Sequence, residues 1–373
     1  MKRTFFICLS LAAVMAVVAC NGSPKNEPEP KASEIEVILP DDLEEIELDW
    51  GGKDRTLDFE WESEDAEAVY SVSFSLSEDL SDAYSVEVGK IFELSMTHEE
   101  LDGMMEELGV GEYRDADIYW AVESRNGNLA ATSEVRSMNV FRFYKPFMDV
   151  VNNDEYKVCR VMDELTGDYY VWMAENLRAA KYSDGTAISP EVRFIGDNDG
   201  EDATMKTVYG GYYTWTGAVR GTTGAESTPK VQGACPEGWH VASKPEWDFL
   251  INCTDGENPG GALKNADYWV AEATNGGKPV SNMIGFSLPA AGYIWQSEAE
   301  GQAPLSNSVI ESGKFACFWT ANAPVEGDEY PWNPPVSDYP YQGVTYAFNS
   351  NDFGAALYPY VRGRGFSVRC VLD

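Results

Sequence analysis

The chain has 373 residues, of which 62 are acidic and 27 are basic, and its formal net charge at pH 7 is −35. A field of that sign repels nucleic acid and anionic membrane surfaces, so it argues against nucleic-acid partners and leaves neutral ligands such as glycans or peptides open. The length predicts two domains rather than one.

The first twenty residues have the pattern of a bacterial lipoprotein signal peptide. Lys2 and Arg3 precede an apolar stretch over residues 5–18, which ends in small residues before Cys20. The stretch is too short to span a membrane comfortably and has the flanks of a signal peptide. A Cys directly after Ala19 resembles the lipobox, so we expect Cys20 to carry the lipid. The alternative is ordinary secretion with an incidental Cys.

The predicted organisation has four parts. Residues 20–34 hold three prolines among Lys, Asn and Glu with no apolar run, which indicates a flexible tether. The parts are a signal peptide (1–19), the lipidated Cys20 with its tether (20–34), a β-sandwich (35–150) and a second domain (155–373).

Alternating apolar and polar residues in the first domain predict short strands. Turn signals between the segments suggest an antiparallel immunoglobulin-like or fibronectin-like sandwich. The apolar residues expected to face the core are Leu57, Phe59 and Trp61, then Val72, Phe74 and Leu76 (with serines on the other face), then Ile118, Trp120 and Val122.

One helix is predicted between these strands. Thr97 and Glu100 form a capping box, and Gly109 is a plausible stop. Apolar residues then recur at helical spacing: Leu101, Met104, Met105 and Leu108.

The first domain resembles the N-terminal domain of SusE-type outer-membrane lipoproteins. The resemblance covers nearly all of residues 35–143, including the segments "LDFEWESEDAEAVYSVSFSLSEDLSDAYSVEV" and "THEELDGMMEELGV". It implies a spacer that holds other domains away from the membrane, with a binding role of its own as the alternative.

The second domain is predicted to be α+β with short strands. Residues 169–173 alternate like a strand, and a capping box at Ser243 and Glu246 starts a helix that buries Trp247, Leu250 and Ile251. Three further segments are predicted to be short strands: 286–292, 315–319 and 366–371.

Six separated motifs in this half are similar, in sequence and order, to the Fibrobacter succinogenes major paralogous domain. They are "WMAENL", "YGGYYTW", "CPEGWHVASKPEW", "GFSLPAAGY", "FWTAN" and "GFSVRCVLD". The resemblance implies a fold similar to C-type lectin-like domains and to the formylglycine-generating enzyme group. It also implies a disulfide between Cys235 and Cys370, and core positions for Trp215, Trp239, Trp247 and Trp319.

Export makes disulfides permissible, and five cysteines lie beyond Cys20. An odd number leaves at least one thiol unpaired or in an intermolecular bond. Cys159, Cys253 and Cys317 have no assigned partner, and a pair of Cys253 with Cys317 is a guess.

Catalytic machinery is sparse. The chain has two histidines: His98 at the exposed start of a helix, and His240, which we expect to be packed or hydrogen-bonded rather than a base. Zinc-site and serine-hydrolase patterns are absent. We therefore expect no catalysis. The remaining enzymatic alternative is a relative of the formylglycine-generating group that uses the unassigned thiols.

A segment of acidic residues offers a weak metal hypothesis. Asp197, Asp199 and Asp202 crowd carboxylates around a turn-forming Gly, which would suit Ca²⁺. The spacing of a helix–loop–helix calcium site is missing, so a solvated turn is the preferred interpretation and no other cofactor is predicted.

Aromatic residues near residue 330 suggest a ligand-binding loop. A proline-stiffened loop presents rings to sugar surfaces at little ordering cost; the alternative is that the rings pack under the loop. The candidates are Tyr330, Trp332, Tyr339 and Tyr341, with Trp295 as an additional one.

The sequence therefore predicts a non-catalytic lipoprotein on the outer surface of the outer membrane. Its expected ligand is an extracellular polysaccharide or oligosaccharide, and its expected setting, by resemblance, is a SusC/SusD-like uptake complex. Membrane contact is expected through the lipid anchor alone. The alternatives are a protein-binding adhesin or structural surface protein, and the enzyme named above.

Overall fold

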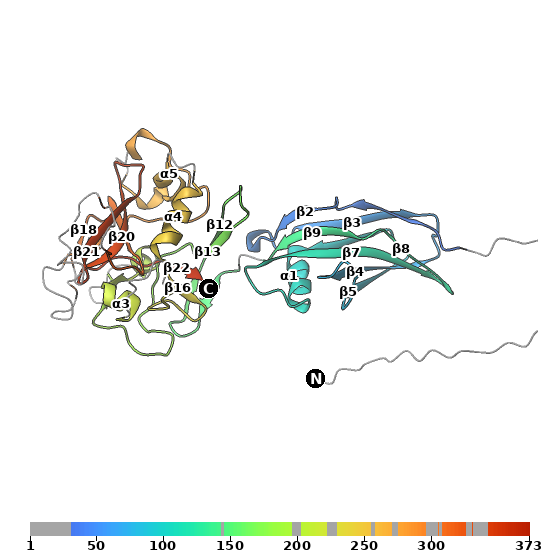
Figure 1. The fold of residues 1–373 in the computed structure, drawn as a ribbon, viewed down its shortest axis with the longest axis horizontal. Coiled ribbons are helices and arrows are strands. Elements are labelled where there is room, and N and C mark those ends of the chain that lie inside the picture. Colours follow the sequence, from blue (N-terminus) through green and yellow to red (C-terminus); the bar gives the residue numbers. More distant parts are fainter. Residues whose placement is uncertain are drawn as a thin grey trace, which may run out of the picture. The chain divides into compact units, whose positions relative to one another are not determined.

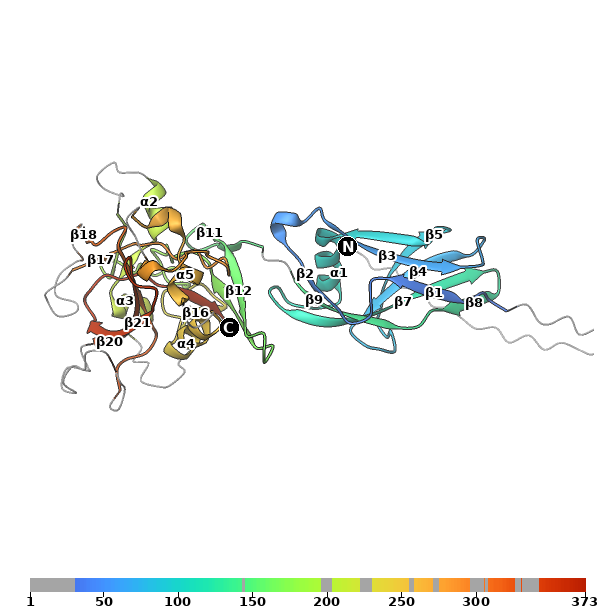
Figure 2. The same ribbon diagram turned by 90° about the horizontal axis from the view of Figure 1, so that it is seen from above.

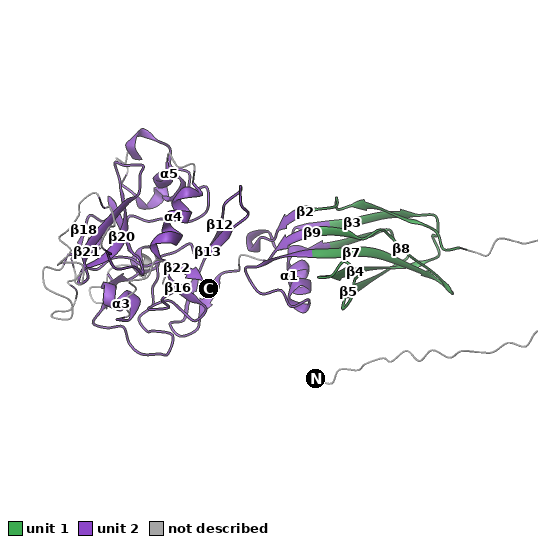
Figure 3. Cartoon of the chain, viewed as in Figure 1, with its two compact units in different colours: residues 1–44, 58–95, 118–138 green, residues 45–57, 96–117, 139–373 purple. Residues whose placement is uncertain are grey.

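The structure is a computed structural model that describes residues 31–142, 145–195, 203–221, 230–254, 258–270, 275–295, 305, 308–325, 330 and 342–373. Cys20 and the predicted signal peptide lie outside these residues. Strands account for most of the regular structure. The chain divides into two compact units (Figure 3): one is Met1–Glu44, Asp58–Ser95 and Ile118–Met138, and the other is Glu45–Leu57, Met96–Asp117 and Asn139–Asp373.

The described residues up to 142 form two sheets and helix α1 (Figure 1). One sheet has the order β1-β3-β6, and the other has the order β2-β9-β7-β4-β5 with β8 paired to β7. The elements are β1 (Ile35–Leu39), β2 (Glu44–Glu47), η1 (Trp50–Gly52), β3 (Thr56–Ser63), β4 (Val69–Ser75), β5 (Tyr84–Gly89), β6 (Glu93–Thr97), α1 (His98–Glu107), β7 (Asp115–Asn126), β8 (Leu129–Thr132) and β9 (Arg136–Phe141).

Aromatic side chains fill the space between these two sheets. The ring of Phe59 in β3 makes edge-to-face contacts with Phe74 of β4 and Trp120 of β7, at centroid distances of 5.1 and 5.0 Å. All three side chains are fully buried. The core positions predicted for β3, β4 and β7 are therefore confirmed at these residues.

The serine face of β4 differs from the prediction. Ser73 and Ser75 are buried, whereas Leu76 is exposed. The Ser73 hydroxyl lies 2.9 Å from that of Ser85, and the Ser75 hydroxyl donates to the Ser81 carbonyl at 2.6 Å. Neighbouring chain segments cover this face, and because the hydroxyl groups have partners, their burial costs little.

Helix α1 begins where the capping box predicts. The Glu100 carboxylate accepts hydrogen bonds from the Thr97 backbone N–H at 2.8 Å and from its hydroxyl at 2.9 Å. Leu101, Met104 and Met105 are buried, and Gly109 takes φ +88° after the last turn, which confirms the predicted stop. His98 starts the helix, as predicted, but it is half-buried.

The residues after 145 form a second group of small sheets with short helices, which we call the head (Figure 2). Its sheets are β12-β13-β22-β16, β19-β20-β21 and three two-stranded pairs: β10-β11, β14-β15 and β17-β18. The elements are β10 (Phe147–Asp149), β11 (Asp154–Tyr156), β12 (Val158–Met162), β13 (Tyr169–Met173), β14 (Val192–Arg193), α2 (Ala203–Tyr209), β15 (Tyr212–Tyr213), α3 (Trp215–Val219), β16 (Trp239–Val241), α4 (Lys244–Asn252), α5 (Pro259–Leu263), η2 (Ala266–Tyr268), η3 (Asn275–Gly277), β17 (Tyr293–Ile294), β18 (Val309–Ile310), β19 (Phe315–Trp319), β20 (Gln342–Asn349), β21 (Ala356–Val361) and β22 (Cys370–Leu372).

The central sheet of the head is covered on both faces. Val171 and Met173 of β13 belong to one hydrophobic cluster, whereas Trp172 belongs to a second. The Trp172 ring contacts Trp247 of α4 at 5.2 Å and Phe286 at 5.5 Å. The strand predicted over residues 169–173 is therefore confirmed as β13, and it has buried side chains on both of its faces.

The predicted core of the head is also confirmed. Four tryptophans have exposed fractions of 1% or less: Trp215, Trp239, Trp247 and Trp319. Helix α4 buries Trp247 and Leu250, and Ile251 is partly buried beside them.

Two predicted strands need correction. The segment 286–292 makes isolated bridges, among them Leu288 with Lys264, rather than a strand. Pro289 in its middle has no N–H to donate to a ladder. In the segment 366–371 the strand starts at Cys370, and Phe366 makes a single bridge to Tyr213. The third predicted strand coincides with β19.

A disulfide joins Cys235 to Cys370, the pair that the family resemblance implies, across 135 residues with a Cα–Cα distance of 6.0 Å. Cys370 pairs with Val241 in the ladder between β16 and β22, so the bond ties the start of the β16 region to the last strand. Cys159, Cys253 and Cys317 are free, so the guessed pairing of Cys253 with Cys317 is wrong.

Candidate functional site

The aromatic residues predicted near residue 330 are only partly within the described chain. Trp332, Tyr339 and Tyr341 lie outside the described residues. Tyr330 is buried, with an exposed fraction of 6%, so its ring presents no open face to a ligand in this structure. Trp295, the additional candidate, is exposed at 47%.

Asp197, Asp199 and Asp202 lie outside the described residues. Within the ranges that the structure describes, no group of three or more His, Cys, Asp or Glu side chains is arranged to hold a metal ion.

The head contains a cavity of about 290 Å³ close to Trp295, which we call the aromatic pocket. Four aromatic rings form its walls, together with an arginine, an asparagine and a glutamate. The lining residues are Tyr293, Glu311, Phe315, Asn349, Tyr360, Arg364 and Phe366.

Strand register brings these residues together from distant parts of the chain. Tyr293 of β17 pairs with Ile310 of β18, which places Glu311 next to the same strand pair. Phe315 at the start of β19 pairs with Asn349 at the end of β20, and β20 pairs with β21, which carries Tyr360. Both views show β20 and β21 side by side (Figures 1 and 2).

The aromatic walls hold one another in place. Tyr293 contacts Phe315 at a centroid distance of 5.8 Å and Phe366 at 6.0 Å. Phe366 contacts Tyr360 at 5.2 Å. Edge-to-face and tilted ring pairs of this kind add to the stability that burial provides. The pocket is therefore preformed by packing within the head.

A two-residue bridge positions Trp295 beside Arg364. The backbones of Ile294 and Gly365 exchange hydrogen bonds of 2.9 and 3.0 Å. A side chain at Gly365 would lie 2.9 Å from the Ile294 Cβ, so glycine permits this close approach. As a result the Arg364 guanidinium lies 4.0 Å from the centroid of the Trp295 ring and 4.7 Å from that of Tyr360.

Arg364 is held by rings rather than by an anion. Its Nε is buried and has no hydrogen-bond partner among the described residues. Glu311 lines the same pocket and is exposed, yet the two side chains form no ion pair in this part of the chain. Burial lowers the pKa of Arg364 from its ordinary value, but an arginine remains charged at neutral pH.

His240 lies elsewhere in the head, in a closed network of carboxylates. Its Nδ1 is 2.7 Å from Asp373 Oδ1, and its Nε2 is 2.7 Å from Glu246 Oε1. Glu246 also accepts hydrogen bonds from the Ser243 N–H at 2.7 Å and from its hydroxyl at 2.8 Å. Both ring nitrogens are occupied and the imidazole is 2% exposed, which agrees with a hydrogen-bonded histidine rather than a base.

The free thiols are poor nucleophiles. Burial raises the pKa of Cys159 and of Cys317 to about 12, and that of Cys253 to about 11. The thiolate is the reactive form of cysteine, so these side chains are almost entirely protonated at neutral pH.

No helix in the described ranges combines the length and the apolar character needed to cross a membrane.

The sequence reasoning found Trp295 but missed the pocket beside it. The sequence predicts strands over 315–319 and 366–371, but Phe315 alone of their pocket residues lies in a strand, and Phe366 makes an isolated bridge. Tyr293 lies in β17, just after the predicted segment 286–292. One signal was present: Arg362 and Arg364 alternate with glycines in a strongly acidic chain. Of these residues, Gly365 is the one that permits the close approach to Ile294.

Two protein-family models match the chain. Residues 168–372 match the Fibrobacter succinogenes major domain, and residues 24–123 match the SusE outer membrane protein family. The matches occupy separate parts of the chain, which supports the two-domain description, and the second supports an outer-membrane location. A search of curated proteins found no match.

Proposed function

We infer function from the premise that the chain belongs to the Fibrobacter succinogenes major domain family, and we propose that it is a glycan-binding lipoprotein of the outer membrane. In this proposal Cys20 carries the lipid anchor and the protein faces the cell exterior. The head holds an extracellular polysaccharide or oligosaccharide in its aromatic pocket without chemical conversion.

The aromatic pocket is the observation that carries the proposal. Its volume of about 290 Å³ lies at the lower end of the range for small-molecule sites and suits one or two sugar rings. Aromatic faces suit the C–H surfaces of sugars, and Arg364 and Glu311 supply a donor and an acceptor for hydroxyl groups. Trp295 extends the aromatic surface beyond the cavity, because its ring is exposed.

Two observations support a binding role over catalysis. The buried thiols are protonated at neutral pH, which disfavours thiol chemistry of the formylglycine-generating kind. His240 has carboxylates on both ring nitrogens, which leaves no nitrogen to take a proton from a substrate.

The first part of the chain acts as a spacer in this proposal. The SusE match covers residues 24–123, and the two sheets of this part pack around a fully buried aromatic core. A rigid spacer after the tether would carry the head away from the membrane surface. The proposed setting is a SusC/SusD-like uptake complex that receives the bound glycan.

The first test is a glycan-array screen of residues 21–373, followed by titration calorimetry with each glycan that binds. The Trp295→Ala variant should bind about two- to tenfold more weakly, because it loses one stacking ring. Trp50→Ala is the matched control, since Trp50 is also an exposed tryptophan with a basic group, Lys53, over its ring at 5.5 Å. The control should bind like the unmodified protein.

Two additional arms cover the residues outside the described chain. A Trp332→Ala variant tests the proline-rich loop, and a chelator arm tests whether Ca²⁺ at Asp197, Asp199 and Asp202 is needed. Binding that only Trp332→Ala abolishes would move the site from the pocket to the loop. A blank array from folded protein would refute glycan binding and favour the protein-binding adhesin.

A further inference from the structure

Arg364 gives the aromatic pocket a buried cationic nitrogen that has no acceptor among the described residues. The described part of the chain places carboxylates beside many basic residues, including Arg142, Arg160, Arg178 and Arg220. Arg364 lines a cavity, yet its Nε is buried and has no partner among the described residues. Arg369 also has no carboxylate beside it, but its guanidinium donates to the Asn176 amide oxygen and to backbone carbonyls, whereas the buried Nε of Arg364 has no acceptor among the described residues.

The surroundings hold the Arg364 guanidinium in place, but no described residue accepts a hydrogen bond from its Nε. The rings of Trp295 and Tyr360 lie 4.0 and 4.7 Å from the guanidinium carbon. Cation–π contacts of this kind stabilise the cation and fix its plane, but they use none of its N–H donors. The planar fork therefore remains ready for an acceptor of matching geometry.

We propose that the aromatic pocket selects a sugar unit that carries a carboxylate, such as a uronic acid, and that Arg364 binds this carboxylate. The inference rests on the proposed function, because it assigns the ligand class of the same pocket. A carboxylate satisfies a guanidinium with two parallel hydrogen bonds, and such charge-assisted bonds are stronger than those to neutral hydroxyl groups. The sugar ring then lies against the aromatic walls.

Glu311 defines the orientation of the ligand within the pocket. It lines the same cavity as Arg364 and forms no ion pair with it in the described residues. An acidic sugar would place its carboxylate at Arg364 and its hydroxyl groups toward Glu311, because the reverse orientation brings two carboxylates together. The proposal therefore predicts opposite effects for charge removal at these two positions.

The experiment compares uronic-acid oligosaccharides with their carboxyl-reduced counterparts, which keep the ring and the hydroxyl groups but lose the charge. Calorimetric titration of residues 21–373 should show the acidic form binding about tenfold or more tightly than the reduced form. The titration is run at about 0.15 M salt, where the repulsion between the acidic ligand and the negatively charged protein is screened beyond about 8 Å. The panel contains galacturonate, glucuronate and mannuronate oligomers, together with a sulfated galactan.

Three variants locate the effect. Arg364→Gln should lower the affinity for the acidic form about tenfold or more and leave that for the reduced form nearly unchanged, so that the preference disappears. Arg364→Lys should restore part of it, because a lysine keeps the charge but not the fork. Glu311→Gln should maintain or strengthen binding of the acidic form.

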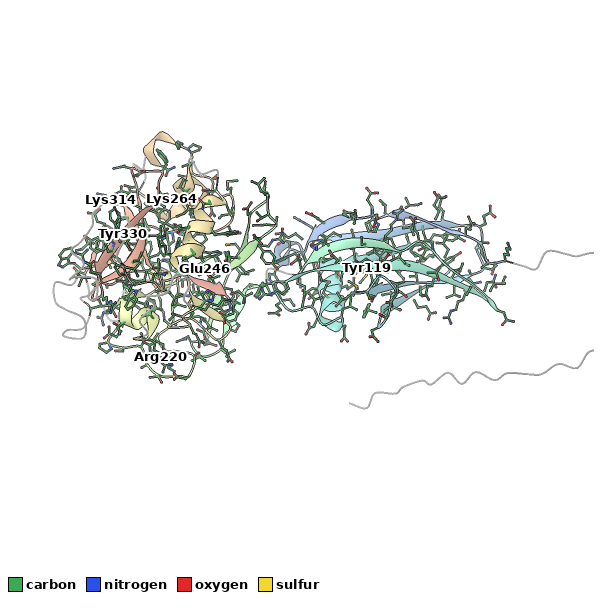
Figure 4. All side chains as sticks on the ribbon, in the orientation of Figure 1. Tyr119, Arg220, Glu246, Lys264, Lys314 and Tyr330 are labelled. Atoms are coloured by element: carbon green, nitrogen blue, oxygen red, sulfur yellow. A yellow bond between two sulfur atoms is a disulfide. The ribbon has the colours of Figure 1, made fainter. Side chains whose placement is uncertain are left out.

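Arg220→Gln is the matched control. Arg220 also lies over a tyrosine ring, that of Tyr182 at 4.4 Å, but it is paired with Asp184 at 2.6 Å. Figure 4 shows Arg220 well apart from Lys314, the chain neighbour of the pocket residue Phe315. This variant should leave both affinities unchanged, and thermal melting of all variants checks that they are folded.

The outcomes separate the two proposals. Equal binding of acidic and reduced sugars, or an acidic preference that survives Arg364→Gln, overturns the carboxylate assignment while glycan binding stands. Preferential binding of the sulfated galactan also overturns it. If the folded protein binds no saccharide, acidic or neutral, glycan binding itself fails.

Discussion

At the scale of single residues, the His240 network is the clearest coupling between protonation and stability. Burial opposes the charged imidazole, but hydrogen bonds and charges from Glu246 and Asp373 outweigh it and raise the pKa of His240 above its usual value. Burial likewise opposes the charged form of Glu246, and the contacts with His240 and Ser243 outweigh it and lower the pKa of that carboxyl.

These shifts predict a pH window. A raised histidine pKa in the folded state contributes stability that is fully present below the unfolded value near 6.5 and is lost as pH rises through the folded pKa. The unfolding free energy of the unmodified protein should therefore fall with rising pH in that range. Replacing His240 with Gln should lower the unfolding free energy by about 1–3 kcal/mol at pH 6 and remove that part of the pH dependence.

Urea unfolding followed by tryptophan fluorescence between pH 5 and 9 measures the difference between the two proteins. His98→Gln serves as the control, because burial lowers the pKa of His98 and its contribution has the opposite sign. If the difference between the unmodified protein and His240→Gln were constant over this pH range, the network would not titrate as described.

At the scale of elements, the two capping boxes differ in their surroundings although their sequence patterns are equivalent. Glu100 caps α1 at the surface, where its carboxylate meets Thr97 and solvent. Glu246 caps α4 in the interior, where the same carboxylate group also holds His240. Burial makes the second cap part of the core of the head.

The two caps should therefore differ in energetic weight. Glu100→Ala should cost about 1 kcal/mol of unfolding free energy, the usual loss for an exposed cap. Glu246→Ala should cost about 3–5 kcal/mol, because it leaves a buried imidazole and the Ser243 N–H without their partner. Equal losses in urea unfolding, followed by circular dichroism, would show that burial of the second box adds nothing.

At the scale of the whole molecule, the disulfide provides the largest single constraint on the unfolded chain. The loop between Cys235 and Cys370 spans 135 residues, and the chain-entropy model assigns about 5 kcal/mol to closing a loop of that length. Cys370 is fully buried in the last strand, so the bond also holds the end of the chain against β16.

Replacing Cys235 and Cys370 together with Ala should lower the unfolding free energy by about 5 kcal/mol. Cys253→Ala is the control, since Cys253 is free and partly exposed, and it should change stability by less than about 1 kcal/mol. Thermal melting with and without reductant gives a second measure, because reductant should destabilise the unmodified protein and leave the double variant unaffected.

Local patterns in the sequence determined much of the fold. The capping boxes at Thr97 and Ser243 specify where α1 and α4 begin, because the interacting residues are three positions apart. The alternation around Phe59 and Phe74 identifies buried strand positions, because successive side chains of a strand point to opposite faces of the sheet. Family resemblance, rather than any local pattern, identified the pairing of Cys235 with Cys370.

The aromatic pocket depended on the tertiary structure. Trp295 and Arg364 are distant in the chain, and only the bridge between Ile294 and Gly365 makes them neighbours. Local patterns also could not show that both faces of β13 and of β4 are covered, since burial of Trp172 or Ser73 depends on which segments pack above them. Short-range hydrogen bonds and side-chain periodicity can be read along the chain. Strand register and the packing of distant segments are set by contacts between residues that the sequence separates, and the pocket exists only where those contacts are made.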